Sequence, residues 1–450
     1  MSDFVGKFGD KRRAAALARL EEEMVSQSSV VVRRLGRDRG GEISYHRALS
    51  AAEVTAAEIV ECLSGRAGRA AVGRRIVVAQ DTTEVNFPSD SRKRLGPAGR
   101  AGKTPGFFIH AAVAIEADEE TVLGLVDAAI WTRDGQAKTA RRHRLLADKE
   151  SERWLHAARL TSARLCQARE RIVVGDRESD IYGLFAGRPL DTHLVVRCAQ
   201  NRKLAEGQLL FDVTTDWTVL GRQKVAVAPR GPGDAGRVAE VSLRAGTVEL
   251  CAPRNGKRGG DPATLAVTMV EAIELDPPDR VKPLHWRLLT TLPGSDLAAA
   301  AEVVRLYRLR WRIEQSFRML KSDGLRFEEA QTYDTHRLFN LAALAIGAAV
   351  RIIQLVDARD GSDRPASDVA SEAEIEAAAA LSPTLEGKTA RQKNPHPKDS
   401  LAWLSWIIAR LGGWNCYYKP PGPKTMRQGW DRFAAIAQGF ALAAEAGKNP

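Results

Sequence analysis

The segment 306–321, LYRLRWRIEQSFRMLK, constrains this chain more than any other part of its sequence. Its apolar residues recur at spacings of three and four, which predicts one helix with a single apolar stripe formed by Leu306, Leu309, Ile313, Phe317 and Leu320. Because a helix turns by about 100° per residue, Tyr307, Arg310, Glu314 and Lys321 would form a second stripe, with their side chains within roughly 60° of one another around the helix axis. One carboxylate among cations is either a solvated face with ion pairs or part of an acidic site.

Two aspartates upstream favour the acidic site. Asp81 follows the apolar run 76–79, and Asp176 follows the apolar run 172–174, and both runs are typical of buried strands. Carboxylates at the ends of neighbouring strands in one sheet are a common way to build an α/β active site. Between these two aspartates in the sequence, the segments 107–117 and 122–131 are expected to pair as a β-hairpin around an acidic turn.

Asp81, Asp176 and Glu314 would offer only oxygen ligands, with almost no histidine near them in sequence. Such ligands favour Mg²⁺ or Mn²⁺ over zinc. Two ions about 4 Å apart can activate a water or a terminal hydroxyl and stabilise the leaving oxygen of a phosphodiester. Spacing alone does not select these three acids, because any long chain contains many.

The bulk properties fit a folded protein that binds a polyanion. The 450 residues carry a formal net charge of +11 with a pI near 9.5, and the length predicts two to four domains. The five cysteines form no C-x-x-C pair, so we expect reduced thiols and no zinc site. The N-terminal segment has no apolar signal core and no run of 18 apolar residues occurs, so we expect a cytoplasmic, nucleoid-associated protein without a membrane partner.

Changes in pattern along the chain predict four segments. Residues 1–70 would be an N-terminal helical domain whose basic connection, with Arg33 and Arg34, either contacts DNA phosphates or packs on the next domain. Residues 71–358 would be an α/β catalytic core, interrupted by a strand-rich insertion at about 205–290. Residues 359–400 read as a linker with one polar helix. Residues 401–450 would form a helical domain that presents a dimerisation surface or packs as a satellite core.

The segment 306–321 matches a Y-(2)-R-(3)-E-(6)-K pattern in full, at Tyr307, Arg310, Glu314 and Lys321. This pattern resembles that of the DDE transposases of the bacterial insertion-sequence-four family, which move DNA by cut and paste. Further segments agree in order and kind: FGDKRR at 8–13, Asp81-Thr82-Thr83, KESERW at 149–154, Asp176-Arg177-Glu178 with Asp180, VVR at 195–197, PLHWRLLT at 283–290 and GGW at 412–414.

The resemblance implies an RNase H-like core, with a mixed sheet flanked by helices and a β-rich insertion before the last catalytic residue. It implies that Asp81, Asp176 and Glu314 hold two Mg²⁺ ions, for which Mn²⁺ can substitute. It assigns contacts with DNA to Tyr307, Arg310, Lys321, Trp286, Trp311 and Arg197. Trp286 would stack on a base flipped out beside the cut, although an indole in a strand can equally belong to the sheet core.

The resemblance also implies an activity: hydrolysis of one strand at each transposon end, attack of the freed 3′ hydroxyl on the other strand to form a hairpin, and joining of the reopened ends to target DNA. Two subunits would hold the two ends of double-stranded DNA in a homodimeric synaptic complex. Two alternatives stay open, an RNase H-like nuclease without joining activity and a catalytically silent DNA-binding repressor. The end sequence and the target preference do not follow from the sequence.

Overall fold

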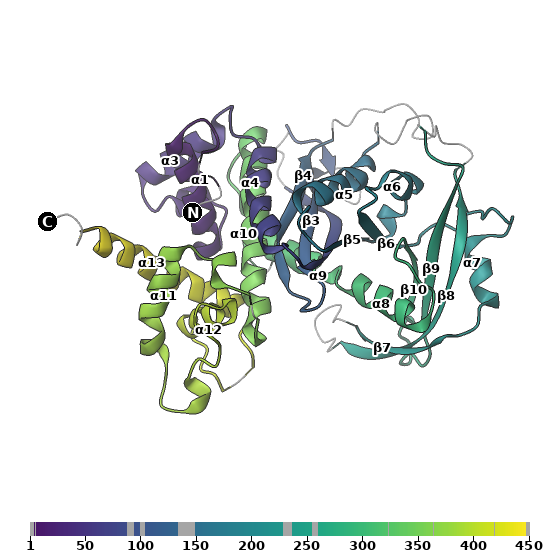
Figure 1. The fold of residues 1–450 in the computed structure, drawn as a ribbon. Helices are drawn as coiled ribbons and strands as arrows, with labels where there is room; N and C mark the ends of the chain where they lie inside the picture. The colour runs from purple at the N-terminus through teal and green to yellow at the C-terminus, as the bar shows by residue number, and fades with distance from the viewer. Residues whose placement is uncertain are drawn as a thin grey trace. The chain divides into compact units, whose positions relative to one another are not determined.

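The computed structural model describes residues 4, 6–87, 94–99, 104–133, 149–227, 236–253, 260–322, 324–362, 364–417 and 419–446. The chain divides into two compact units (Figure 1). Unit 1 comprises residues 1–73, 82–136 and 312–450, and unit 2 comprises residues 74–81 and 137–311. These units cut across the four segments predicted from the sequence, and those segments stay predictions.

Unit 2 is built on a mixed sheet. Its hydrogen-bonded order is β1–β5–β6–β10–β9–β8–β7, where the first three strands are parallel and the remaining neighbours are antiparallel. The strands are β1 (Arg75–Asn86, which runs on into unit 1), β5 (Glu170–Gly175), β6 (Thr192–Arg197), β7 (Gly221–Val227), β8 (Arg237–Cys251), β9 (Thr264–Glu274) and β10 (His285–Thr290).

The parallel strands are short apolar runs because both of their faces are covered. All of β5 except its first residue is buried, and residues 76–80 of β1 are buried as well. The helices of unit 2 are α5 (Glu152–Arg164), η4 (Arg177–Ser179), α6 (Tyr182–Gly187), α7 (Leu210–Val213), η5 (Thr214–Asp216) and α8 (Leu297–Arg308). Helix α5 contacts β5 and β6, and α8 packs along the sheet from β5 to β7.

Unit 1 combines a small group of strands with many helices. The strands are β2 (Pro97–Ala98), β3 (Thr104–Glu116) and β4 (Val122–Trp131), and β3 pairs antiparallel with both β2 and β4. The helices are α1 (Lys11–Gln27), α2 (Val32–Leu35), α3 (Arg39–Ser50), α4 (Ala56–Ala70), α9 (Trp311–Leu320, in unit 1 from its second residue), η6 (Phe327–Glu329), α10 (Thr335–Asp357), η7 (Ala358–Asp360), η8 (Ala366–Asp368), α11 (Glu372–Leu385), η9 (Ala390–Gln392), α12 (Leu401–Leu411) and α13 (Pro423–Ala446).

Helix α10 is the centre of unit 1. It contacts β4, α1, α4 and α13, so the N-terminal and C-terminal helices share one core instead of forming separate cores. By length and composition α10 could cross a membrane, but 94% of its most apolar window is buried within the structure. That burial is typical of the central helix of a folded core.

Several expectations from the sequence are confirmed. The chain is α/β, with a large mixed sheet flanked by helices. Strands β3 and β4 form the predicted hairpin. The strands β7 to β10 occupy the stretch predicted to be strand-rich, and they extend the sheet of β1, β5 and β6.

Gly175, the last residue of β5, is expected to be intolerant of substitution. A Cβ at this position would lie 2.2 Å from the Ser179 hydroxyl oxygen, and that hydroxyl donates a 2.6 Å hydrogen bond to the Asp176 carbonyl. Gly175→Ala should lower the free energy of unfolding by about 1–3 kcal/mol, measured by urea denaturation, because Ser179 must move. Gly65→Ala is the matched control: its Cβ meets only the flexible end of Arg69 within α4, and it should stabilise by about 0.5–1 kcal/mol. Equal effects at the two positions would contradict the steric explanation.

Glu271 on β9 should make stability depend on acid pH. Its side chain is 2% exposed and accepts hydrogen bonds from His285 Nε2 at 2.9 Å and Arg287 Nε at 2.8 Å. Burial opposes ionisation, but these two partners outweigh it and lower the pKa of Glu271 from 4.5 to about 2. A lowered pKa means that this stabilisation is fully present above about pH 4.5 and is lost as the pH falls towards 2.

Glu271→Gln should therefore lower the free energy of unfolding by about 3 kcal/mol at neutral pH. The difference from wild type should shrink as the pH falls towards about 2, because protonation then begins to neutralise the Glu271 carboxylate. Urea denaturation of both proteins across this range measures the effect. Glu240→Gln, which removes a largely exposed partner of Arg222, should cost less than about 0.5 kcal/mol. A difference for Glu271→Gln that stays constant with pH would rule out the ionised carboxylate as its cause.

Candidate functional site

Asp81 and Asp176 follow neighbouring positions of two parallel strands. The register of β1 and β5 ends at the pair Gln80 and Gly175, and Asp81 and Asp176 are the residues that directly follow this pair in the chain. Their side chains are 25% and 33% exposed, respectively. The parallel pairing thus places two partly exposed carboxylates at one edge of the sheet, as expected for an α/β site.

The prediction that Asp81 lies just past its strand is wrong. Strand β1 continues to Asn86, so Asp81 lies inside it, although the ladder with β5 has already ended. The residues that follow, Thr82, Thr83 and Val85, are β-branched and favour an extended chain. The short apolar run marked only the part of the strand that pairs with β5.

Each aspartate has a cationic neighbour in unit 2. Arg310 Nη1 lies 3.1 Å from Asp81 Oδ2, and Arg197 Nη1 lies 3.8 Å from Asp176 Oδ1. The Tyr307 hydroxyl donates a hydrogen bond of 3.2 Å to the same Asp176 oxygen. Opposite charges at these distances offset the repulsion between two carboxylates held close together on adjacent strands.

Tyr307 is the central aromatic residue of this cluster. Its side chain is 3% exposed, and burial together with the nearby Asp176 carboxylate raises its pKa to about 12. The phenol therefore stays protonated at neutral pH and remains a hydrogen-bond donor. The Trp286 ring meets the Tyr307 ring edge to face at 5.1 Å, and the Arg310 guanidinium lies 6.0 Å from the centre of the Tyr307 ring.

The predicted single helix over 306–321 is wrong, because the segment forms two helices. Helix α8 ends at Arg308 and α9 begins at Trp311, and the turn between them is closed by bonds from Leu309 N to Leu306 O and from Arg310 N to Tyr307 O. The four residues of the predicted polar stripe therefore do not share one uninterrupted helix face. No proline or glycine marks the break.

The break coincides with a change of packing partners. Helix α8 packs on the sheet of unit 2, whereas α9 is anchored within unit 1 by Arg312. Arg312 pairs with the buried Asp357 at 2.8 Å and donates to the Glu120 carbonyl at 2.9 Å. Long-range contacts of this kind override the local helical pattern.

The remaining predicted residues of this segment lie on or beside α9. Trp311 is its first residue, and Glu314 lies half-buried in its first turn, where the helix dipole favours a carboxylate. Lys321 follows the last residue of α9. Burial lowers the pKa of Lys321, against the opposing effect of the Glu328 and Glu84 carboxylates.

The structure thus brings six predicted residues into one cluster within unit 2, the carboxylate cluster: Asp81, Asp176, Arg197, Trp286, Tyr307 and Arg310. Glu314 and Lys321 belong to unit 1. Within the described ranges, no three His, Cys, Asp or Glu side chains are grouped as a metal site. The Asp81 and Asp176 carboxylates, which are partly exposed oxygen donors, fit the ligand preference of a hard divalent cation.

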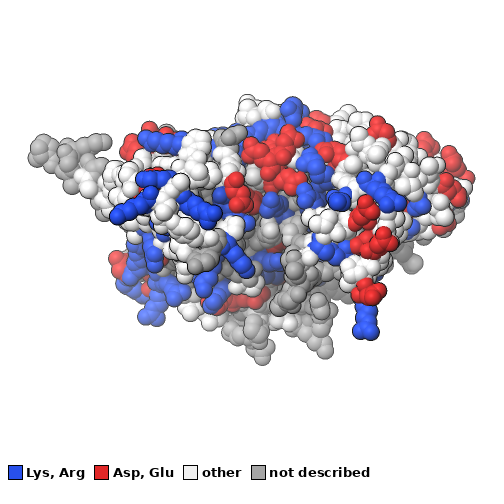
Figure 2. Space-filling model, turned by 90° about the horizontal axis from the view of Figure 1, so that it is seen from below, with Lys and Arg blue, Asp and Glu red and all other residues white. Residues whose placement is uncertain are grey.

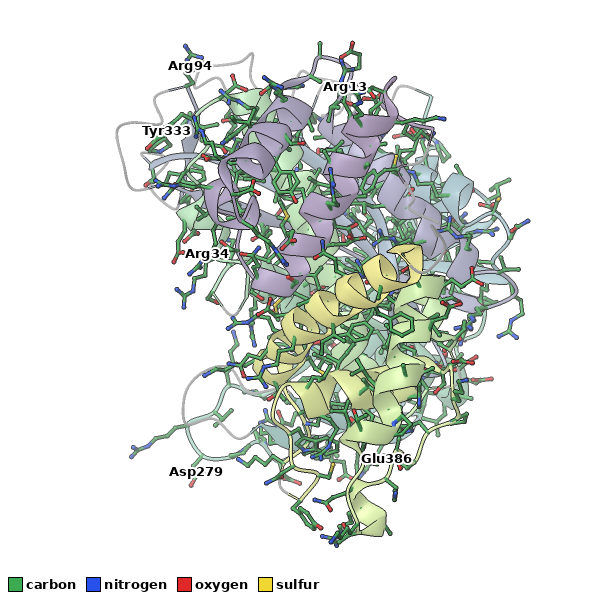
Figure 3. All side chains as sticks on the ribbon, turned by 90° about the vertical axis from the view of Figure 1, so that its left-hand side faces the viewer. Arg13, Arg34, Arg94, Asp279, Tyr333 and Glu386 are labelled. Atoms are coloured by element: carbon green, nitrogen blue, oxygen red, sulfur yellow. The ribbon has the colours of Figure 1, made fainter. Side chains whose placement is uncertain are left out.

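Arg33 and Arg34 belong to α2 of unit 1 and are not part of the carboxylate cluster of unit 2. Both side chains are exposed, as expected for the basic connection between the N-terminal helices. Arg34 is labelled in Figure 3, where its side chain extends away from the ribbon.

The sequence alone did not reveal the role of Asp180, which is fully buried. Its carboxylate accepts hydrogen bonds from Ala199 N at 2.8 Å and Gln200 N at 2.9 Å, and it pairs with Arg202. Asp180 therefore fixes the segment that directly follows Arg197, and it acts as a positioning residue. Its place in the Asp176-Arg177-Glu178 motif was the available signal, but the motif does not show which acid is buried.

Comparison with known proteins places the chain in a family. Among solved structures, it is similar to the cryo-EM structure of a piggyBac transposase synaptic complex with hairpin DNA, with 8% identity and a TM-score of 0.40 over 95% of this chain and 72% of that chain. A likeness this low does not indicate a shared activity. The sequence model of the family described as transposase DDE domain, however, matches residues 73–351, which is more than half of the chain. The chain therefore belongs to the transposase DDE domain family.

Proposed function

We propose that this protein is a cut-and-paste DNA transposase of the insertion-sequence-four kind, in which Asp81, Asp176 and Glu314 are the catalytic carboxylates. The family match over residues 73–351 supports a transposase. The observation that carries the site is the pair Asp81 and Asp176, placed side by side by the parallel strands β1 and β5. Glu314 is the acid of the Y-(2)-R-(3)-E-(6)-K pattern, and we propose that it completes the set around an RNase H-like core.

The three carboxylates would hold two Mg²⁺ ions, or Mn²⁺ in their place. Bound ions would activate the attacking oxygen and stabilise the leaving oxygen of a phosphodiester. Arg310 and Arg197 neutralise Asp81 and Asp176 in the free protein. With these carboxylates serving as metal ligands, both guanidinium groups would be available to contact phosphate, for which their planar donors are suited.

Tyr307 orients Asp176 rather than exchanging protons. Because its pKa is raised to about 12, the phenol stays a donor throughout the physiological range. Its bond to one Asp176 oxygen leaves the other oxygen available for a cation. Trp286, half-buried against Tyr307, would stack on a base displaced beside the cut, worth about 1–3 kcal/mol. Lys321 and Trp311 would contact the same DNA end.

The proposed reaction runs in three stages. Hydrolysis frees a 3′ hydroxyl at each transposon end, this hydroxyl attacks the opposite strand to give a hairpin, and the reopened ends are joined to target DNA. Two subunits would form the synaptic complex, each holding one end of double-stranded DNA. The cytoplasm, at the nucleoid, is the compartment where such DNA is accessible.

A cleavage assay tests the proposed carboxylates. Asp81→Asn, Asp176→Asn and Glu314→Gln should each lower the cleavage rate at least about 10²-fold, because each loses a charged ligand while keeping its shape. The substrate is a duplex that carries the gene's own flanking inverted repeats, with and without Mg²⁺. Wild type should cut at the repeat boundary only when metal is present.

Other outcomes of the assay would favour the alternatives. Cleavage of the duplex without joined products would favour the alternative of an RNase H-like nuclease that lacks joining activity. A wild-type protein that shifts the duplex but never cuts it would be a repressor, and the carboxylates would then be structural. Full cleavage activity of Glu314→Gln would show that Glu314 is not one of the catalytic carboxylates.

Tyr307→Phe should lower the cleavage rate about 10-fold, as expected from the loss of one hydrogen bond to a charged group. Affinity for the duplex, measured by fluorescence anisotropy, should hardly change, because the 3% exposed Tyr307 side chain offers little surface for the DNA contact that the resemblance assigns to it. Tyr182→Phe is the matched control, because Tyr182 is also buried in unit 2 and its hydroxyl donates to the Pro262 carbonyl at 2.9 Å. If both variants lose the same activity, the effect comes from a general loss of stability and the orienting role of Tyr307 is wrong.

A further inference from the structure

A cleft of about 700 Å³ in unit 1 is unusually rich in arginine. Five of the residues that line it are arginines: Arg34, Arg37, Arg326, Arg427 and Arg432. Its acidic lining residues are Glu329 and Asp431. The arginines come from three distant parts of the chain, namely α2 with the turn after it, the turn after α9, and α13. We call this the arginine cleft.

Two of these arginines have no partner among the residues that the structure describes. Arg37 pairs with Glu23 at 3.0 Å, Arg326 pairs with Glu329 at 3.3 Å, and Arg432 donates to a backbone carbonyl at 2.6 Å. The side chains of Arg34 and Arg427 make no hydrogen bond or ion pair within the described ranges. The five guanidinium groups outnumber the two carboxylates that line the same cleft, so they repel one another on balance, and an anion relieves that repulsion.

The backbone around the cleft is also unusual. Ser28, Arg37 and Arg326 have left-handed backbone angles, with φ of 46°, 58° and 51°. They account for three of the eight non-glycine residues with positive φ in the described part of the chain. Residues held in this conformation are over-represented at binding sites, where surrounding contacts maintain the strain.

The face seen in Figure 2 carries patches of acidic groups among the basic ones. A polyanion would therefore be bound where arginines outnumber acids locally, as in the arginine cleft. Figure 3 labels Arg34, one of the residues that line the cleft, and shows its side chain extending away from the ribbon.

We propose that the arginine cleft binds the phosphate backbone of double-stranded DNA, as a contact separate from the carboxylate cluster. The proposal rests on the transposase function proposed above and adds the surface that holds the DNA. Arginines from three segments suit a polymer, because each guanidinium can contact a different phosphate. The contacts would carry affinity, not sequence preference. The C-terminal helix α13 would then be part of the DNA-binding surface.

The test measures the salt dependence of DNA binding. The full-length double variant Arg34→Gln/Arg427→Gln is titrated against a labelled duplex with the flanking inverted repeat, using fluorescence anisotropy at several salt concentrations. Loss of two phosphate contacts should reduce the slope of log K against log salt by about 2, and should weaken binding about 10-fold or more at low salt. A scrambled duplex should show the same loss.

A second double variant, Arg391→Gln/Lys388→Gln, is the matched control. It removes two positive charges from exposed positions of unit 1 outside the cleft, and its slope should stay close to that of wild type. Thermal unfolding of all variants checks that each is folded. Equal losses in the two double variants would mean that only net charge matters, and this would overturn the proposal.

The cleavage assay separates this inference from the proposed function. If wild type binds and cuts the duplex but Arg34→Gln/Arg427→Gln binds it equally well, the cleft proposal fails while the transposase stands. If wild type neither binds nor cuts, both fail. Titration with inorganic pyrophosphate adds one more outcome: pyrophosphate binding lost in the variant, with duplex binding unchanged, would make the cleft a small-anion site and overturn the proposal.

Discussion

The parallel pairing of β1 with β5 is the constraint on which the candidate site depends. Because the ladder ends at Gln80 and Gly175, it delivers Asp81 and Asp176 together at one edge of the sheet. Two carboxylates held this close repel each other unless cations or donors face them. Arg310, Arg197 and Tyr307 supply those groups, and they come from the turn after α8, from β6 and from α8 itself. The pairing of the strands therefore causes the repulsion between the two carboxylates, and neighbouring elements of the same unit supply the groups that offset it.

The conformation of the site also depends on groups that never face it. Gly175 has no room for a side chain because Ser179 folds back to bond the Asp176 carbonyl. Asp180, fully buried, fixes the backbone after Arg197 by accepting two amide protons. Two of the three acids in the GDRESD sequence therefore have different roles: the partly exposed Asp176 belongs to the candidate site, whereas the buried Asp180 stabilises the backbone beside it.

Much of the fold could be predicted from local pattern. Apolar runs revealed the buried strands, alternation revealed the hairpin and the strands β7 to β10, and the positions of the aspartates followed from where the first runs end. The break between α8 and α9 could not be predicted, because Leu309 and Arg310 are ordinary helix residues and the break follows from the anchoring of Arg312 on Asp357. The length of β1 was also missed, since Thr82 to Asn86 lack an apolar run. Pairings such as Tyr307 with Asp176 join residues 131 positions apart, and no local pattern reports them.

The arginine cleft has a consequence for the free protein. The guanidinium groups of the cleft outnumber its acids, so they repel one another and destabilise the folded chain. Dissolved ions screen this repulsion over distances beyond about 10 Å at moderate ionic strength. Added salt should therefore strengthen the folded state of the isolated chain, while it weakens any complex held together by phosphate contacts. The same ions would therefore have opposite effects on folding and on binding. The salt concentration at which the free protein is most stable would be one at which its affinity for a polyanion is low.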